Sequence, residues 1–373
     1  MKRLTVLIAV LFIALVSVFP VKADTYDDFL NDNNASEALD KLPESAKKSL
    51  KDIGIDSFSY KDLENLDLNK IISSILNIAG SQGETPLKAF AAVIAVMLLY
   101  SMLYGVKNSA EGSLQPVISV SVTLCITCIL VLPLMDFITN TVDVIKISSD
   151  FMTAYVPLMV LAISMSGQPV SAAGYYGLMM FMGQGVSRVS SEIISPFMKI
   201  FLALGVSSSI SPNINLNGIV QFISKFTRIL LVFCMSIFTG VLSFKQVISM
   251  GADSVSSRAV RLSLSSFVPI VGSALSEAYR TVQGSIGLLK SGIGIISIIA
   301  LAAVYLPIII KCLFWMLTLG FAKAVGEVLN LREPCTLLMS VYSVISTLFA
   351  VILCMIMLFI ISTSIVIMLG GGG

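Results

Sequence analysis

Long, nearly uncharged apolar runs are the feature that most constrains this chain. Between residues 86 and 369 the sequence repeatedly runs for about 20 residues with few charges. A helix of about that length crosses the hydrocarbon core of a bilayer, whereas the strands of a membrane barrel alternate in hydropathy. Of the 373 residues 56% are hydrophobic and only 12% are charged, about half the charged fraction of a soluble domain. The predicted fold class is therefore all-α, as a polytopic helical membrane protein.

The first 23 residues have the pattern of a secretory signal. Lys2 and Arg3 precede an apolar stretch over 4–18, and Val21-Lys22-Ala23 offers a small-residue cleavage site. The apolar stretch is about 15 residues long, which is short for a membrane span. We predict a signal peptide over 1–23 that is cleaved after Ala23, with a retained anchor as the alternative. In both cases residue 24 begins outside the cytoplasm.

Residues 24–85 form an acidic segment that differs in composition from the rest of the chain. Up to Glu84 it has 13 acidic and 6 basic residues, a net charge of −7. Pro43 and the spacing of apolar residues predict short helices over 44–53 and 62–79. About 60 residues make only a marginal core by themselves. We predict a small helical extracytoplasmic segment that orders against a partner or the membrane, with a solvated spacer as the alternative.

The apolar runs divide into seven predicted spans, with six or eight as alternatives. Residues 86–244 hold spans one to five, and residues 292–373 hold spans six and seven with a short tail. One stretch, 174–206, is interrupted by Gly183, Gly185 and Pro196 and is predicted to hold a span plus a re-entrant or interfacial helix. The other predicted spans cover 86–106, 116–134, 151–166, 219–244, 293–310 and 337–369.

Charge orients these spans. The predicted loop 136–150 carries three aspartates against Lys146, which favours the outside. The connector 245–291 carries five basic and two acidic residues, a net charge of +3 and the strongest positive-inside signal in the chain. An external start followed by five spans also leaves this connector in the cytoplasm. We therefore predict an amphipathic cytoplasmic loop over 245–291.

The centre of this connector is neither a span nor an ordinary loop. Its sequence, "SFVPIVGSALSEAYR" over 266–280, mixes apolar residues with a proline, a glycine and an acid–base pair at helical spacing. The proline and glycine break a helical pattern, and the remainder suits helices that lie on the membrane surface or dock a protein. The residues predicted to dock a partner are Arg258, Arg261, Phe267, Pro269, Gly272, Glu277 and Arg280.

Three basic residues lie within or near the predicted spans. Lys225 and Arg228 are close to the start of span five, and Lys311 interrupts an otherwise apolar run. A charge deep in a bilayer costs about 3 kcal/mol or more unless it is paired or solvated. These side chains either reach the interface along their aliphatic stems or face a pore or another subunit.

The sequence argues against several chemistries. It contains no histidine, which excludes His-dependent triads and His-ligated metal sites. Cys125 and Cys128 have a CxxC spacing but lie within a span, where cysteine acts as a small apolar residue. Residues 287–291 are not a phosphate loop, because Leu289 stands where glycine must precede the lysine. No carboxylate stands out near a span centre, which weakens an ion-coupled transporter. We predict no enzyme activity, cofactor, metal or nucleic acid.

The order and length of these features resemble the stage III sporulation protein AE family. The specific part is the Phe-Val-Pro-Ile-Val-Gly block at 267–272, and the likeness continues through 273–311 and in outline over the whole chain. The resemblance implies a multi-pass subunit of a channel or secretion-like complex in the mother-cell membrane around the forespore, needed for late forespore gene expression and spore development. It implies as partners other stage III sporulation membrane proteins, a cytoplasmic secretion-type ATPase and ring-forming subunits.

Two other functions are kept as alternatives. A stand-alone permease for a small solute would move that solute in vesicles containing this protein alone. A membrane scaffold without a passage would show no water-exposed stripe at mid-depth along spans five and six.

Overall fold

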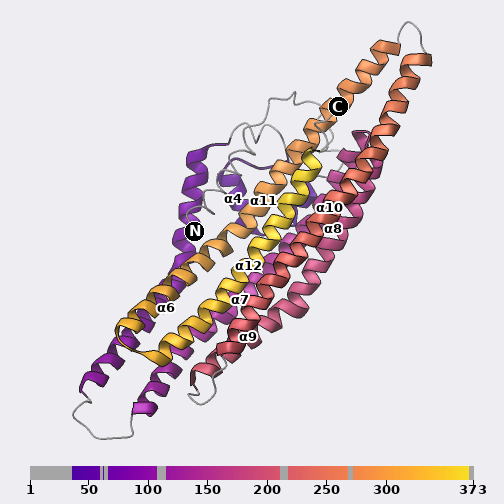
Figure 1. Cartoon of the computed structure of the whole chain (residues 1–373). Helices are drawn as coiled ribbons and strands as arrows, with labels where there is room; N and C mark the ends of the chain where they lie inside the picture. The colour runs from indigo at the N-terminus through magenta and orange to yellow at the C-terminus, as the bar shows by residue number, and fades with distance from the viewer. Residues whose placement is uncertain are drawn as a thin grey trace.

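The computed structural model describes residues 36–58, 62, 66–106, 115–210, 217–267 and 272–368, and the regular structure in these ranges is helical. Two short helices precede a bundle of long ones (Figure 1). The predicted signal peptide and its cleavage site at Ala23 lie outside the described residues. The helices are α3 (Ser36–Asp40), α4 (Glu44–Asp52), α6 (Leu68–Val106), α7 (Gln115–Met165), α8 (Pro169–Val189), the π-helical turn η2 (Ser190–Ile194), α9 (Ser195–Ile210), α10 (Asn217–Phe267), α11 (Gly272–Val328) and α12 (Arg332–Met368).

Several of these helices are much longer than a bilayer requires. α10 and α11 have 51 and 57 residues, which at 1.5 Å per residue makes them about 77 and 86 Å long. The hydrocarbon core of a bilayer is only about 30 Å thick. Within the described residues, five helical stretches are long and apolar enough to cross a membrane: 69–102, 120–165, 169–207, 291–328 and 332–367. This supports the predicted helical membrane fold.

The predicted external loop over 136–150 is wrong. α7 runs without interruption from Gln115 to Met165 and joins the predicted second and third spans into one helix. Asp136, Asp143 and Asp150 are seven residues apart, close to two helical turns, and all three are exposed on one face of α7. Apolar residues between them, such as Phe137 and Ile145, are fully buried. The aspartates therefore mark a helix face that was misread as a loop.

The broken stretch 174–206 also forms a single pass. α8, η2 and α9 follow one another directly, so the helix continues from 169 to 210 with a π-helical turn where Ser190–Ile194 lie. Such turns insert one residue into a helix without ending it. The predicted additional re-entrant or interfacial helix is not found. The long described helices then make six passes along the bundle, which is one of the alternatives to the seven predicted spans.

The short N-terminal helices pack against the side of the bundle (Figure 1). α4 matches the helix predicted over 44–53, while the helix predicted over 62–79 continues through Pro86 as α6. Leu50 and Phe58 are buried in the same apolar cluster as the bundle core, and α4 contacts α11 and α6. The acidic segment thus orders on the body of its own chain in its described part.

In Figure 1 α4 lies beside the middle of α11, and the connection between α10 and α11 lies well beyond it at the upper tip of the molecule. Only four passes separate them: α6, α7, the α8–α9 run and α10. The predicted topology has five spans between the two regions and places them on opposite sides of the membrane. Because the predicted spans two and three are one helix, the two cues for orientation no longer agree. The predicted signal sequence now favours an external α10–α11 connection, whereas the positive-inside rule favours a cytoplasmic one.

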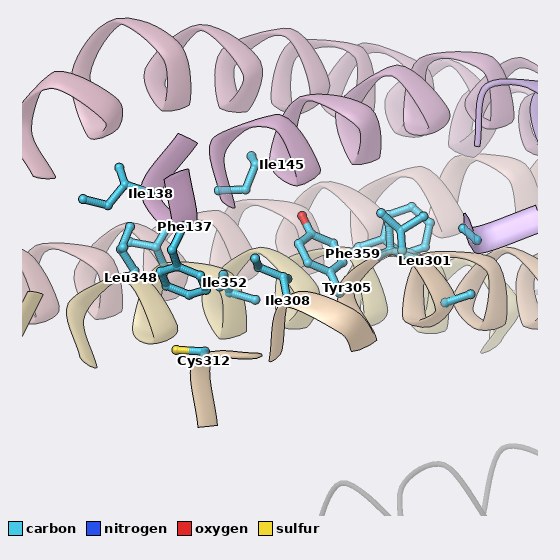
Figure 2. Packing of buried hydrophobic residues seen from close by; sticks show 14 of the residues in the cluster. Phe137, Ile138, Ile145, Leu301, Tyr305, Ile308, Cys312, Leu348, Ile352 and Phe359 are labelled. Atoms are coloured by element: carbon cyan, nitrogen blue, oxygen red, sulfur yellow. The ribbon is translucent and has the colours of Figure 1, made fainter. Parts of the chain in front are cut away.

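The core of the bundle is formed by α7, α11 and α12. Figure 2 shows Phe137, Ile138 and Ile145 of α7 near Leu348 and Ile352 of α12, with Ile308 and Tyr305 of α11 alongside. Two glycines permit close helix contacts. A Cβ at Gly294 would lie 2.7 Å from Ile367 Cδ1, and one at Gly205 would lie 2.9 Å from Ser340 Cβ. Small residues at such crossings are typical of helix packing in membranes.

Candidate functional site

The connector predicted as a loop over 245–291 is a helical hairpin that projects from the bundle. Its two arms are the end of α10 and the beginning of α11, and Figure 1 shows them extending beyond the other helices. Residues 268–271, which include Pro269, lie outside the described residues. The predicted interruption near the proline and Gly272 agrees with the helix ends. The predicted separate surface helices do not occur, because each arm continues one of the bundle helices.

The predicted docking residues lie near the tip of this hairpin. Arg258 is exposed on α10. Arg261 and Phe267 follow it on the same helix, while Gly272, Glu277 and Arg280 lie in the first turns of α11. The backbone therefore gathers these residues, apart from Pro269, at one end of the molecule. The docking role itself stays a prediction.

A buried carboxylate fastens the base of the hairpin to the bundle. Asp253 of α10 is 2% exposed. The backbone N–H groups of Val170 and Ser171 donate to its two carboxylate oxygens, at 3.0 and 2.8 Å. These N–H groups belong to the first turn of α8, where the helix itself provides no acceptor for them. The helix dipole also favours a negative charge at this end. Asp253 thus caps a helix 83 residues away in sequence.

The surrounding turn explains why this cap forms. Gly167 between α7 and α8 has φ 78°, a left-handed conformation that glycine adopts without strain. Pro169 then begins α8, and proline suits this position because it has no N–H to satisfy. This contact could not be predicted from the sequence, because a single aspartate in a basic connector carries no local signal of a distant helix start.

The three predicted span charges lie on two helices, α10 and α11. Lys225 is exposed on α10, whereas Lys311 is half-buried on α11. Arg228 lies one turn after Lys225 on α10. A pore-facing or subunit-facing role for these three residues stays a prediction.

The bundle interior also contains a cluster of hydroxyl groups. Tyr155 of α7 interacts with Tyr175 of α8 and with Ser297 and Thr363 from α11 and α12. The hydroxyls of Tyr155, Tyr175 and Thr363 are buried and have no hydrogen-bond partner of good geometry among the described residues. An unsatisfied buried hydroxyl costs about 1–3 kcal/mol. The aromatic rings compensate in part, since Tyr155 packs against Phe359 with centroids 5.8 Å apart.

Metal-ligating side chains are not grouped in the part of the chain that the structure describes. Cys125 and Cys128 are exposed on α7 and unpaired with another cysteine. The features that the structure offers for function are therefore surfaces and helix contacts: the hairpin, its Asp253 anchor and the polar groups of the bundle.

These features are those of a helical membrane protein, with five described helical stretches long and apolar enough to cross a bilayer. The family model described as stage III sporulation protein AE matches residues 54–370, and the chain belongs to this family. The stage III sporulation protein AE of Bacillus subtilis (strain 168) is 22% identical over 353 residues, which cover 94% of this chain and 86% of that relative. No solved structure matches the chain. The resemblance seen in the sequence is thereby confirmed.

Proposed function

We propose that this protein is a non-enzymatic membrane subunit of the stage III sporulation channel or secretion-like complex, located in the mother-cell membrane around the forespore. The observation that carries the proposal is the family match, which spans both the bundle and the hairpin over residues 54–370. Its partners would be other stage III sporulation membrane proteins, a secretion-type ATPase and ring-forming subunits. Its task would be to support late gene expression in the forespore.

The packing of the bundle supports a passage formed between subunits rather than through one chain. The interior contacts among α7, α11 and α12 are apolar and close, and the cavity among Tyr305, Phe359 and neighbouring methionines is only about 20 Å³. That volume is about the size that holds one water molecule. This favours a subunit that contributes a wall or a brace over a stand-alone permease.

The acidic face of α7 supports a polar neighbour on the outside of the bundle. Asp136, Asp143 and Asp150 are exposed on that face and span 14 residues, about 21 Å along the helix. Lipid hydrocarbon does not tolerate such charges. Water or the basic surface of another subunit would solvate them, as expected at a subunit boundary or a passage wall.

We further propose that the hairpin lies on the external side, together with the N-terminal helices. The hairpin carries five basic residues, but Lys225, Arg228, Lys323 and Arg332 lie near the opposite end of the bundle. The positive-inside rule counts basic residues on each side, and here the two ends are nearly balanced. The signal sequence then decides the orientation. The partner at the hairpin would be an external ring-forming or membrane protein rather than the ATPase.

The orientation can be tested with a thiol reagent that does not cross membranes. All six cysteines are first replaced, and Arg258→Cys then reports on the hairpin. Val328→Cys, 86% exposed at the opposite end, is the matched control. Labelling of intact cells at residue 258 and not at 328 supports the external hairpin. The reverse pattern restores the cytoplasmic placement.

The function is tested in the source organism. Deletion of the gene should abolish output from a late forespore transcription reporter, and the intact gene should restore it. Normal reporter output in the deletion strain would contradict the proposed function. Cysteines introduced along the acidic face of α7 then distinguish two roles. If the face lines a passage, a water-soluble thiol reagent reacts at mid-depth; if the protein is a scaffold, it does not.

A further inference from the structure

A polar pocket lies where α11 ends and α12 begins, far from the hairpin. Its volume is about 410 Å³, within the range of small-molecule sites. It is open to the surface rather than enclosed. The side chains that give it its chemistry are Lys323, Glu327, Asn330, Arg332, Thr336 and Ser343.

The turn between the two helices shapes this pocket. Asn330 has φ 58°, the left-handed conformation that ends α11. The N–H of Leu331 donates to the carbonyl of Gly326 at 2.9 Å, and that of Asn330 donates to Glu327 at 3.1 Å. A Cβ at Gly326 would lie 2.6 Å from Cys335 Sγ. This tight closure holds the last turn of α11 beside the first turn of α12.

The pocket has an excess of positive charge. Lys323 Nζ pairs with Glu327 Oε1 at 3.2 Å. Arg332 is exposed and has no ion-pair partner among the described residues. With two cations and one carboxylate, the pocket has a formal charge of +1 and offers ammonium, guanidinium and amide donors. A guanidinium beside a lysine suits a phosphate group, which arginine can contact through two parallel hydrogen bonds.

The position of the pocket identifies the source of the phosphate. It lies at the junction of the apolar windows 291–328 and 332–367, where both helices would leave the hydrocarbon. Phe321, two residues before Lys323, is 58% exposed, and Met339 in the pocket wall is also exposed. Exposed apolar side chains next to basic ones are typical of the level of lipid headgroups. We propose that this pocket binds the phosphate of an anionic phospholipid headgroup.

The proposal is tested on the full-length protein by native mass spectrometry. Phosphatidylglycerol and phosphatidylcholine are titrated separately into the protein in detergent. Lys323→Gln combined with Arg332→Gln should weaken phosphatidylglycerol binding by about tenfold and leave phosphatidylcholine binding unchanged. Lys199→Gln, which removes a half-buried cation of α9 outside the pocket, is the matched control and should have no effect.

Two further variants keep the test decisive. Lys323→Arg combined with Arg332→Lys preserves the charge and should retain the preference for phosphatidylglycerol. Arg332→Gln alone, at an exposed position, serves if the double variant does not fold. Equal phosphatidylglycerol binding by the wild type and the glutamine variants would overturn the proposal. So would displacement by inorganic phosphate without any preference between the two lipids, because the pocket would then bind a free anion.

Discussion

The two helices that form the hairpin are packed differently within the bundle. In the bundle, α11 is enclosed by its neighbours, and Leu301, Ile308 and Cys312 are almost fully buried. α10 instead exposes large apolar side chains along its length, and Val232 and Val255 are 67% and 71% exposed. Both helices have the same geometry, but neighbouring helices cover α11 and leave one face of α10 open. The difference indicates that packing fixes α11, while α10 keeps apolar surface exposed.

The largest effect is expected from opening a cavity in the bundle core. Phe359→Ala removes a fully buried ring that packs against Phe151 and Tyr155. We expect a loss of about 3 kcal/mol in unfolding free energy. Phe244→Ala, at a 70% exposed site on α10, is the matched control and should change stability by less than about 0.5 kcal/mol. Unfolding in mixed detergent gives the free energy of unfolding of both variants. Similar losses in the two variants would contradict the difference in packing between the core and α10.

A smaller loss is expected where the two regions meet. Asp253→Ala leaves the N–H groups of Val170 and Ser171 without their acceptor and should cost about 2 kcal/mol. Asp253→Asn keeps one acceptor oxygen and should cost less. A cysteine pair across α8 and α10 measures the separation by cross-linking. Unchanged cross-linking and stability in the alanine variant would show that the cap does not anchor the hairpin.

Removing a hydroxyl from the buried cluster should leave the free energy of unfolding nearly unchanged or slightly raise it, unlike the loss expected in the apolar core. Tyr175→Phe removes a buried hydroxyl that has no well-placed partner among the described residues and retains the ring. Deleting such a group is nearly neutral or slightly stabilising, within about 0.5 kcal/mol. The same detergent unfolding assay applies, with Tyr305→Phe for comparison. A loss of more than about 1 kcal/mol would mean that the Tyr175 hydroxyl is hydrogen-bonded in the native protein.

Charge reversal on the hairpin should leave stability almost unchanged. Arg258→Glu combined with Arg261→Glu reverses two charges on the hairpin arm of α10, where Arg258 is exposed. We expect a change below about 0.5 kcal/mol in unfolding free energy. If the hairpin docks a partner, co-purification of that partner with the protein should decrease severalfold. Retained co-purification at normal stability would contradict the docking role of these arginines.

The helical membrane character of the chain could be predicted from its apolar runs, because a bilayer leaves few other ways to satisfy the backbone. The helix ends near Pro269 and the helix of 44–52 were also recognisable locally. The course of α7 was not predicted, since Asp136, Asp143 and Asp150 resemble a loop until their common helical face is noticed. That misreading changed the number of passes and with it the relative placement of the hairpin.

Sequence by itself determined that this protein is helical and bilayer-embedded, and that it belongs to its family, because hydropathy and short motifs are local properties of the chain. Tertiary structure alone decided that α4 packs against α11, that Asp253 caps α8, and that Lys323 and Arg332 line one pocket. These facts depend on which helix faces meet across long sequence separations, and packing rather than local composition selects those contacts.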